Sequence, residues 1–303
     1  MERKEFALQS EYDNLTLHGT VYEPKGEKKG IFQIEHGMCE RTKRYEEMMK
    51  FFCSYGYVTI CHDHRGHGDS VEKEEDRGWF RDKQGKAIVS DSVQITRYIK
   101  QLYPDLPVVL FGHSMGSMVV RCYIQEHDDL IDKLIVCGSP SKNPLAGMGI
   151  FLAKTLSLFK GDRHRSRLLT YLSTGKGNQK FPNEGKGCWL SRNRQNIEEF
   201  YADEKCRFVF TCNGFENLFK LMKNTYSKKK YEVKNPSLPI FFVSGSDDAV
   251  LGGEKGFKKV VNFMRKRGYT NVSSKLYPKL RHEIFNDLGK EEVYADLLAF
   301  TQK

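Results

Sequence analysis

Long hydrophobic runs are missing from this chain of 303 residues. The longest apolar stretch, residues 145–159, is interrupted by Gly147, Gly149 and Lys154. A transmembrane helix needs about 18–20 consecutive apolar residues. The first six residues are mostly charged and contain no apolar segment of the kind found in a secretory signal peptide. We therefore expect neither a membrane-spanning helix nor a secretory signal.

Paired cysteines are also missing, although the chain has eight cysteines. No two of them have the C-x-x-C spacing that is typical of zinc and redox sites. Several fall inside expected strands or helices, where a free thiol behaves as a small buried hydrophobic group. The pattern predicts a reduced, cytoplasmic protein without a structural zinc site or other metal.

Fixed-period repeats and low-complexity tracts are likewise not found. The length suits one large α/β domain with an insertion, and 39% hydrophobic residues suffice for a sizeable core. The net charge of +10 is unevenly distributed. Residues 141–236 contain 19 Lys and Arg against 8 Asp and Glu, whereas the rest of the chain is almost neutral. A positive field of this kind attracts anionic lipid surfaces, acidic substrates or nucleic acid.

The hydrophobic pattern predicts an α/β fold. Two antiparallel strands are expected first, at 6–10 and 15–22. Strands and helices then alternate, with strands at 30–34, 57–61, 107–111, 133–137, 239–243 and 273–277, and helices at 45–55, 87–102, 254–267 and 291–301. Repeated βαβ units imply a mostly parallel eight-stranded sheet with helices on both faces. Active sites of such sheets lie at the carboxyl ends of the strands.

Residues 141–236 interrupt this alternation. They contain helical patterns at 145–159, 198–207 and 213–223, and loops rich in Gly and Lys near 175–187. We interpret this segment as a helical cap inserted over the strand ends. Residues 1–140 and 237–303 then form the core. The alternative is a separate globular domain.

The most informative motif is Gly112-His113-Ser114-Met115-Gly116, a G-x-S-x-G sequence. An expected buried strand precedes it and a helical pattern follows it. This is the context of a nucleophile elbow, in which a sharp turn exposes the serine hydroxyl above the sheet. The two glycines permit a turn that side chains would obstruct. Ser114 is therefore the predicted nucleophile.

A serine nucleophile needs a base, and the base needs an orienting acid. His282, on the loop after the last expected strand, is the predicted base; the alternative is a surface histidine in a basic loop. Asp247 and Asp248 both follow the expected strand 239–243, and only one of two adjacent side chains can face the imidazole. We favour Asp248.

Backbone N–H groups must also stabilise the oxyanion. One is expected from Met115, at the start of the helix after Ser114, and the other from Met38, on the loop after strand 30–34. Gly37 allows the backbone to approach closely. We expect His36 to support this loop by hydrogen bonding rather than to serve as a triad member or metal ligand.

Five motifs occur in order along the chain: residues 36–45 (HGMCERTKRY), 63–70 (DHRGHGDS), 112–116 (GHSMG), 245–248 (GSDD) and 281–286 (RHEIFN). Together they resemble the monoacylglycerol lipase and lysophospholipase group of α/β-hydrolases. The resemblance covers residues 15–140 and 237–303 and implies the α/β-hydrolase fold. It also implies that Asp248, the fourth position of G-S-x-D, is the triad acid, and that Met38 and Met115 form the oxyanion hole. Of the 141–236 segment, only 214–219 is similar to the group.

These observations predict a serine-dependent hydrolase of lipid esters, such as monoacylglycerols or lysophospholipids, that works through an acyl-enzyme and needs no cofactor or metal. Residues 145–152 either line an acyl tunnel or form ordinary cap core. The predicted substrate contacts are Gly37, His113, Leu145, Ile150 and Phe215.

The sequence leaves several alternatives to this function. The most similar alternative is a general short-chain carboxylesterase, and the preferred acyl length of the substrate would distinguish it from a lipid-ester hydrolase. Epoxide hydrolases and dehalogenases need Asp where Ser114 stands. An aminopeptidase needs carboxylates in the cap to bind the free amine of its substrate, and the basic composition of residues 141–236 argues against this function. The positive charge predicts peripheral contact with anionic membranes. A nucleic-acid-binding protein is a distant alternative, motivated by the clusters 163–167 and 228–230, and no nucleic acid is expected.

Overall fold

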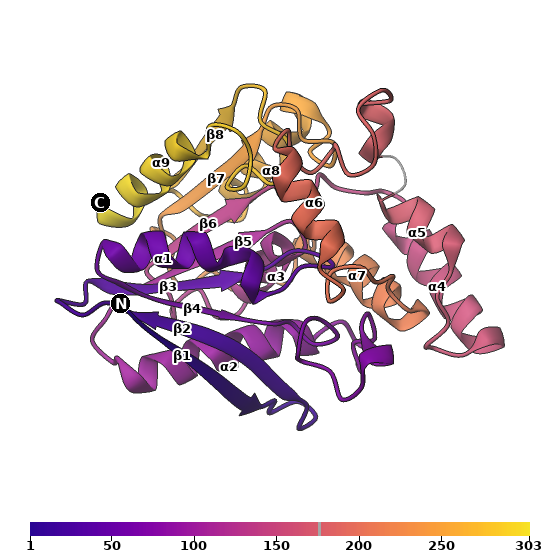
Figure 1. Ribbon diagram of the computed structural model, residues 1–303, viewed down its shortest axis with the longest axis horizontal. Helices are drawn as coiled ribbons and strands as arrows, with labels where there is room; N and C mark the ends of the chain where they lie inside the picture. Colours follow the sequence, from indigo (N-terminus) through magenta and orange to yellow (C-terminus); the bar gives the residue numbers. More distant parts are fainter. Residues whose placement is uncertain (175–176) are drawn as a thin grey trace.

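The computed structural model describes residues 1–174 and 177–303. A single eight-stranded sheet with the order β1-β2-β4-β3-β5-β6-β7-β8 runs through the molecule (Figure 1). Its strands are β1 (Glu2–Gln9), β2 (Thr16–Glu23), β3 (Gly30–Glu35), β4 (Tyr57–His62), β5 (Val108–His113), β6 (Lys133–Cys137), β7 (Ile240–Gly245) and β8 (Val272–Tyr277).

The sheet is mostly parallel, as the sequence predicts. β2 pairs antiparallel with β1 and β4, and every other neighbouring pair is parallel. β3, β4, β5 and β7 are buried over their whole length, in keeping with their continuous apolar runs. The carboxyl ends of the parallel strands therefore meet at one edge, where the loops after β3, β5, β7 and β8 lie.

Helices cover both faces of the sheet. One face is packed by α2 (Ala87–Leu102), α3 (Met115–Tyr123) and α8 (Gly253–Arg265), which share one buried cluster with the strands. The opposite face is packed by α1 (Glu46–Ser54) and α9 (Lys290–Gln302), which share a second cluster. Two short 3-10 helices, Thr42–Tyr45 and Glu74–Asp76, lie in the loops after β3 and β4.

The described part of the segment from β6 to β7 contains helices joined by loops and no strand. It contains α4 (Ala146–Lys160), α5 (Arg167–Thr174), a 3-10 helix (Gly177–Lys180), α6 (Arg194–Ala202) and α7 (Cys212–Thr225). α7 packs against α3 and α4, and a third buried cluster joins these helices. Figure 1 shows α4 and α5 projecting away from the sheet. The division of the chain into core and cap stays a prediction.

The predicted helices of this segment need two corrections. α5 was not expected, and α6 begins four residues before the predicted start at 198 and ends at Ala202 instead of 207. Asp203 has an extended backbone, with a ψ of 110°, and this stops the helix. Across residues 1–174 and 177–303, no helix combines the length and apolar character needed to cross a bilayer.

The turn between β5 and α3 is held in close contact with neighbouring backbone. Ser114 has a φ of 53°, a left-handed conformation that few non-glycine residues adopt. A Cβ on Gly112 would come within 2.4 Å of the Gly116 carbonyl oxygen, and a Cβ on Gly116 within 2.0 Å of the Glu35 carbonyl oxygen. Both glycines of the motif are therefore required by close backbone contact.

We expect Gly116→Ala to destabilise the protein by about 2–3 kcal/mol, because its methyl group would collide with backbone of β3 that cannot move aside. Thermal unfolding should show a fall in Tm of roughly 5 °C or more. Gly147→Ala, in α4, is the matched control: its Cβ meets no atom within 4 Å, so its Tm should stay the same or rise. Equal Tm values for the two variants would contradict this interpretation of the turn.

Candidate active site

Three side chains from three loops form a hydrogen-bonded chain at the carboxyl edge of the sheet. His282 Nε2 lies 2.8 Å from Ser114 Oγ, and His282 Nδ1 lies 3.0 Å from Asp248 Oδ2. Ser114 follows β5, Asp248 follows β7 and His282 follows β8. The structure thus brings together the three predicted triad residues in the geometry of an activated serine.

Asp248, and not Asp247, faces the imidazole. Its Oδ2 also accepts a hydrogen bond from the Ser244 hydroxyl at 3.0 Å, and its Oδ1 accepts one from the Val250 N–H at 2.9 Å. Burial alone would raise the pKa of Asp248, but the charge of His282 and these hydrogen bonds outweigh burial and keep that pKa below its usual value. Asp248 is therefore ionised and fixed at neutral pH.

His282 is buried, and its pKa reflects two opposing effects. Burial lowers the pKa, but the facing carboxylate of Asp248 more than compensates and holds it above its ordinary value. The ring of Trp189 lies against the imidazole, with 5.1 Å between the ring centroids. Trp189 thus covers the base on the side of the 141–236 segment.

The predicted oxyanion residues lie beside Ser114. Met115 is the first residue of α3, so its N–H has no acceptor within the helix. Met38 lies on the loop after β3, and both methionines line the same cavity as Ser114. An α-helix N-terminus and a nearby loop N–H can together stabilise a developing negative charge.

The loop that carries Met38 is held by a buried carboxylate. Glu40 Oε2 accepts hydrogen bonds from the Gly37 N–H at 2.7 Å and from the Tyr45 hydroxyl. His113 contacts both Tyr45 Oη and Glu40 with Nδ1, and its Nε2 lies 3.2 Å from the His282 carbonyl oxygen. Gly37 and His113 therefore connect the Met38 loop, the elbow and the His282 loop.

His36 makes the supporting contacts expected from the sequence. Its Nδ1 bonds to the Gly37 carbonyl oxygen at 2.8 Å, and its Nε2 accepts a hydrogen bond from the His64 N–H at 2.8 Å. The two bonds specify the neutral tautomer with the proton on Nδ1.

A cavity of about 510 Å³ opens onto Ser114. Its wall is mainly apolar and comes from the Met38 loop, from α3 and from the 141–236 segment. The apolar lining includes Met38, Met115, Met118, Trp189, Leu190, Phe200, Phe208, Val209, Leu218 and Met222. A cavity of this size and character suits a small molecule with a substantial apolar part.

Four charged residues also line the cavity: Glu40, Lys186, Arg207 and Glu283. The Glu283 carboxylate is fully buried and pairs with Arg44 at 2.5 Å, and the Asn196 side chain donates to the same oxygen at 2.8 Å. The Glu40 carboxylate is also buried and is occupied by hydrogen bonds from Gly37 and Tyr45. The charges that a substrate can reach are therefore those of the exposed Lys186 and Arg207. The polar part of the cavity is therefore positive.

The structure does not place the other predicted substrate contacts in this cavity. Gly37, His113, Leu145, Ile150 and Phe215 are all outside its wall as the described residues form it. Leu145 is 56% exposed and Phe215 is fully buried in the third cluster. Gly149 of α4 faces the ring of Phe219 of α7, so this part of α4 packs on α7 and not on the Ser114 cavity. The acyl-tunnel interpretation of residues 145–152 therefore has no support here.

Sequence reasoning missed several residues of the cavity. Trp189, Lys186 and Arg207 come from loops of the 141–236 segment, and Phe200 and Tyr201 come from α6. No motif marks them, and only folding of this segment over the sheet edge brings them near Ser114. Glu283 lies in the motif 281–286, but no role is assigned to it from the sequence. Its position directly after His282 could have indicated that it lies in the cavity wall.

A second buried polar cluster lies beneath the Met38 loop and contains Glu35, His62 and His64. Burial raises the pKa of Glu35 to about 8 and lowers the pKa of His62 to about 3. These are the residues of the described chain whose donor atoms converge as metal ligands do. They do not touch the Ser114 hydrogen-bond chain.

The electrostatics predict a titration that can be measured directly. His282 should keep its proton to a pH above 6.5, because Asp248 stabilises the imidazolium. Asp248→Asn removes that charge, which is the largest effect opposing burial, so the pKa of His282 should fall. NMR of 15N-histidine-labelled protein across pH gives both values. Asp247→Asn is the control and should leave the titration unchanged; a shift of equal size in that variant would contradict the assignment.

Sequence comparison places the chain among known hydrolases. Residues 26–289 match the family described as serine aminopeptidase, S33. The human monoglyceride lipase is 25% identical over 293 residues, which span 91% of this chain and 86% of that protein. A phospholipase of Bacillus subtilis is 24% identical over 275 residues, which span 90% of this chain and 95% of that protein.

Structural comparison agrees with this placement. A thermostable carboxyl esterase from Bacillus coagulans, solved in complex with glycerol, superposes with a TM-score of 0.91 and 27% identity. The superposition covers all of this chain and 98% of the esterase. With the family match over most of its length, the chain belongs to the serine aminopeptidase S33 family and is a serine hydrolase with the α/β-hydrolase fold.

Proposed function

We propose that this protein hydrolyses carboxylic esters that carry one fatty acyl chain, such as monoacylglycerols. The observation that carries the proposal is the mainly apolar cavity of about 510 Å³ whose wall contains Ser114 and His282. An acyl chain in this cavity would place its ester carbonyl beside Ser114 Oγ. The activities named for the human monoglyceride lipase and the Bacillus coagulans carboxyl esterase support ester hydrolysis.

The mechanism follows from the hydrogen-bond chain. His282 Nε2 takes the proton of Ser114 Oγ as the oxygen attacks the ester carbonyl carbon. The N–H groups of Met38 and Met115 stabilise the oxyanion of the tetrahedral intermediate. His282 then protonates the leaving alcohol, and an acyl-enzyme on Ser114 remains. Water attacks this ester with His282 as base again, and Ser114 leaves with the proton. Asp248 orients the imidazole and stabilises its charged form.

Lysophospholipids are a second candidate substrate class. Lys186 and Arg207 are exposed cations in the cavity wall, and among the described residues the ion-pair partner of Arg207 is the exposed Glu204, at 3.6 Å. Cations that are not neutralised by buried carboxylates suit a phosphate group. The activity named for the Bacillus subtilis phospholipase is in line with this alternative.

Peptide substrates with a free amino group fit the cavity less well, although the family is described as serine aminopeptidases. An α-ammonium group needs a carboxylate that is not already neutralised. Glu283 is paired with Arg44, and Glu40 holds Gly37 and Tyr45. The remaining charges in the wall, Lys186 and Arg207, would repel an ammonium group.

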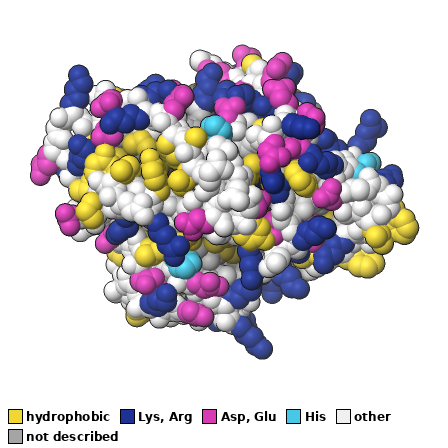
Figure 2. Space-filling model, turned by 90° about the horizontal axis from the view of Figure 1, so that it is seen from below, with side chains coloured by type: hydrophobic (Ala, Val, Ile, Leu, Met, Phe, Trp, Pro, Cys, Tyr) yellow, Lys and Arg dark blue, Asp and Glu magenta, His cyan; other side chains and the backbone are white. Residues whose placement is uncertain are grey.

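We further propose that residues 141–236 act as a cap that docks on anionic membranes. The described residues of α4 and α5 expose large apolar side chains: Met148 (58%), Phe151 (72%), Leu158 (81%), Phe159 (80%), Leu168 (52%), Tyr171 (50%) and Leu172 (44%). Figure 2 shows hydrophobic side chains beside Lys and Arg at the end of the molecule where Figure 1 places α4. Exposed apolar side chains that can insert into a bilayer, next to basic residues such as Lys160 and Arg167, are typical of a helix that lies at a membrane surface.

We also propose that the protein is cytoplasmic. All eight cysteines are free and buried, as expected for a chain that folds under reducing conditions.

We expect Ser114→Ala to lower the rate of ester hydrolysis about 10⁴–10⁶-fold, because the nucleophile is lost. Wild-type protein should hydrolyse p-nitrophenyl esters with a maximum at medium or long acyl chains, and should cleave monoacylglycerol. Ser54→Ala, at the exposed end of α1 and outside the cavity wall, is the control and should retain activity.

The substrate series separates the alternatives. Preference for acetyl and butyryl esters would indicate a general carboxylesterase, and faster cleavage of lysophospholipid than of monoacylglycerol would indicate the phosphate-bearing class. Full activity of Ser114→Ala in a protein of unchanged Tm would contradict the mechanism.

The membrane proposal predicts binding to vesicles of phosphatidylserine and phosphatidylcholine that weakens with salt. Leu158→Ser with Phe159→Ser should reduce sedimentation with these vesicles roughly tenfold or more, because each buried apolar side chain contributes about 1.5–3 kcal/mol. Leu102→Ser with Leu288→Ser alters two leucines outside the segment that are each 55% exposed, and serves as control. Equal binding of both double variants would contradict docking through α4.

A further inference from the structure

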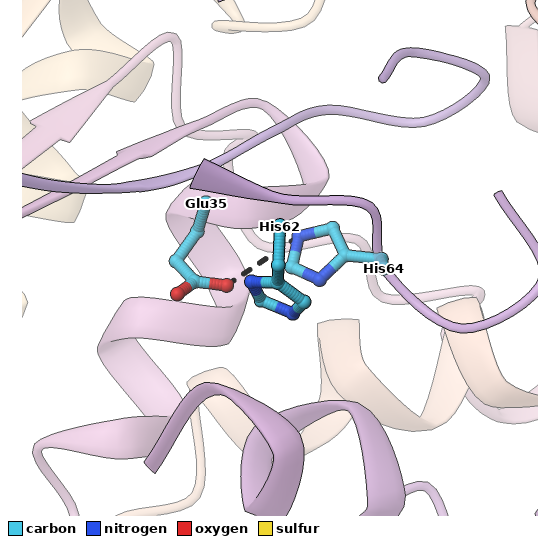
Figure 3. A group of neighbouring side chains, drawn as sticks. All are labelled: Glu35, His62 and His64. Carbon is cyan, nitrogen blue, oxygen red and sulfur yellow. Dashed lines mark ion pairs between the residues drawn. The ribbon is translucent and has the colours of Figure 1, made fainter. Parts of the chain in front are cut away.

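A compact group of metal-ligating side chains lies at the ends of β3 and β4, apart from the Ser114 chain. Glu35 is the last residue of β3, His62 is the last residue of β4, and His64 follows two residues later. One carboxylate oxygen and one nitrogen of each ring all lie within 4.8 Å of one another. Figure 3 shows the carboxylate and the two imidazoles converging.

Five polar atoms of this group have no hydrogen-bond partner within the described residues. Glu35 Oε2 and both ring nitrogens of His62 and His64 are buried without a hydrogen bond. All three side chains are completely shielded from solvent. Buried polar atoms are almost always satisfied, so five such atoms in one place indicate a ligand or ordered solvent at this position.

The cluster is held in place by neighbouring hydrogen bonds. The Gln33 amide donates to Glu35 Oε1 at 2.8 Å and thereby leaves Oε2 turned toward the histidines. Gln33 is itself fixed by the Thr96 hydroxyl, which donates to it at 2.7 Å. The His64 N–H is bonded to His36. Such secondary contacts are what orients the ligands of protein metal sites.

We propose that Glu35, His62 and His64 bind a divalent transition-metal ion of the zinc class. Two imidazoles and one carboxylate are a recurrent ligand set for such ions, whereas magnesium and calcium prefer oxygen ligands only. Ligands at about 2.0–2.1 Å from a tetrahedral ion lie about 3.4 Å apart. The 3.6 Å between Glu35 Oε2 and His64 Nε2 is close to that separation. An ion would satisfy three of the five orphaned atoms at once.

The ion would act on the fold next to the active site and not on the substrate. Glu35 directly precedes His36 and the Met38 loop, and its carbonyl oxygen packs against Gly116 of the nucleophile turn. His64 is bonded to His36, which holds Gly37. A metal at Glu35, His62 and His64 therefore ties the ends of β3 and β4 together beneath the loop that carries Met38.

Full burial has a kinetic consequence. An ion without a path from solvent must be acquired during folding or through local opening, and it should then exchange slowly. The protein should therefore retain bound metal through dialysis against a mild chelator at neutral pH.

The experiment uses untagged full-length protein unfolded in guanidinium chloride with EDTA, then refolded with either Zn²⁺ or EDTA. After removal of free metal, we expect close to one zinc per chain by inductively coupled plasma mass spectrometry in the first sample only. The zinc-refolded sample should unfold at a Tm at least about 5 °C higher. Glu35→Gln and His62→Gln preserve side-chain size and should each abolish both the retained zinc and the Tm difference.

Two controls separate this site from others. His127→Gln alters a half-buried histidine beyond the end of α3 and should retain zinc, and so should Ser114→Ala, which tests the catalytic proposal independently. Absence of retained zinc and of a Tm difference in wild-type protein would overturn the proposal and leave ordered water as the partner of these atoms. Zinc retained equally by Glu35→Gln and His62→Gln would also overturn it, because the ion would then lie elsewhere.

Discussion

The close contact between the nucleophile turn and the end of β3 is the constraint on which the rest of the site depends. Gly116 brings α3 so near to Glu35 that a single methyl group would not fit between them. This contact sets the first N–H of α3 beside the loop that carries Met38. It also forces Ser114 into a left-handed backbone conformation with its hydroxyl directed away from the sheet. A looser turn would separate Ser114 from the N–H groups that we propose as oxyanion donors, so strain at one residue is the condition for the whole arrangement.

Buried carboxylates fix the other parts of the site, each in a different way. Asp248 is ionised because His282 and two hydrogen bonds outweigh burial, and it orients the base. Glu40 is held well below its usual pKa range by its contacts with His113 and Tyr45 despite burial, and it positions the Met38 loop. Glu35, by contrast, faces His64, whose pKa burial keeps well below its usual value, and burial raises the pKa of Glu35. The difference among these three carboxyl groups comes from their partners and not from their depth.

The 141–236 segment supplies much of the cavity beside Ser114. It supplies Trp189 against the catalytic imidazole, much of the apolar cavity wall, and the cations Lys186 and Arg207. It also carries the excess positive charge and the exposed apolar side chains of α4 and α5. The outer surface of this segment and the part of the cavity wall that it forms are therefore both apolar with basic residues. Both faces suit an amphipathic lipid ester.

The sequence by itself determined the sheet, the order of its elements and the identities of Ser114, Asp248 and His282, because these depend on local patterns: apolar runs, tight-turn glycines and polar residues directly after strands. It did not determine the cavity wall. Leu145, Ile150 and Phe215 are expected there from the sequence, but Leu145 is exposed and the other two pack in the cluster that α3, α4 and α7 share, whereas Trp189 and Phe200 line the cavity. Nor did it reveal the convergence of Glu35, His62 and His64, which lie up to 29 residues apart and meet only because β3 and β4 are neighbours in the sheet. Contacts between segments far apart in the chain depend on tertiary packing, and only the folded structure decided them.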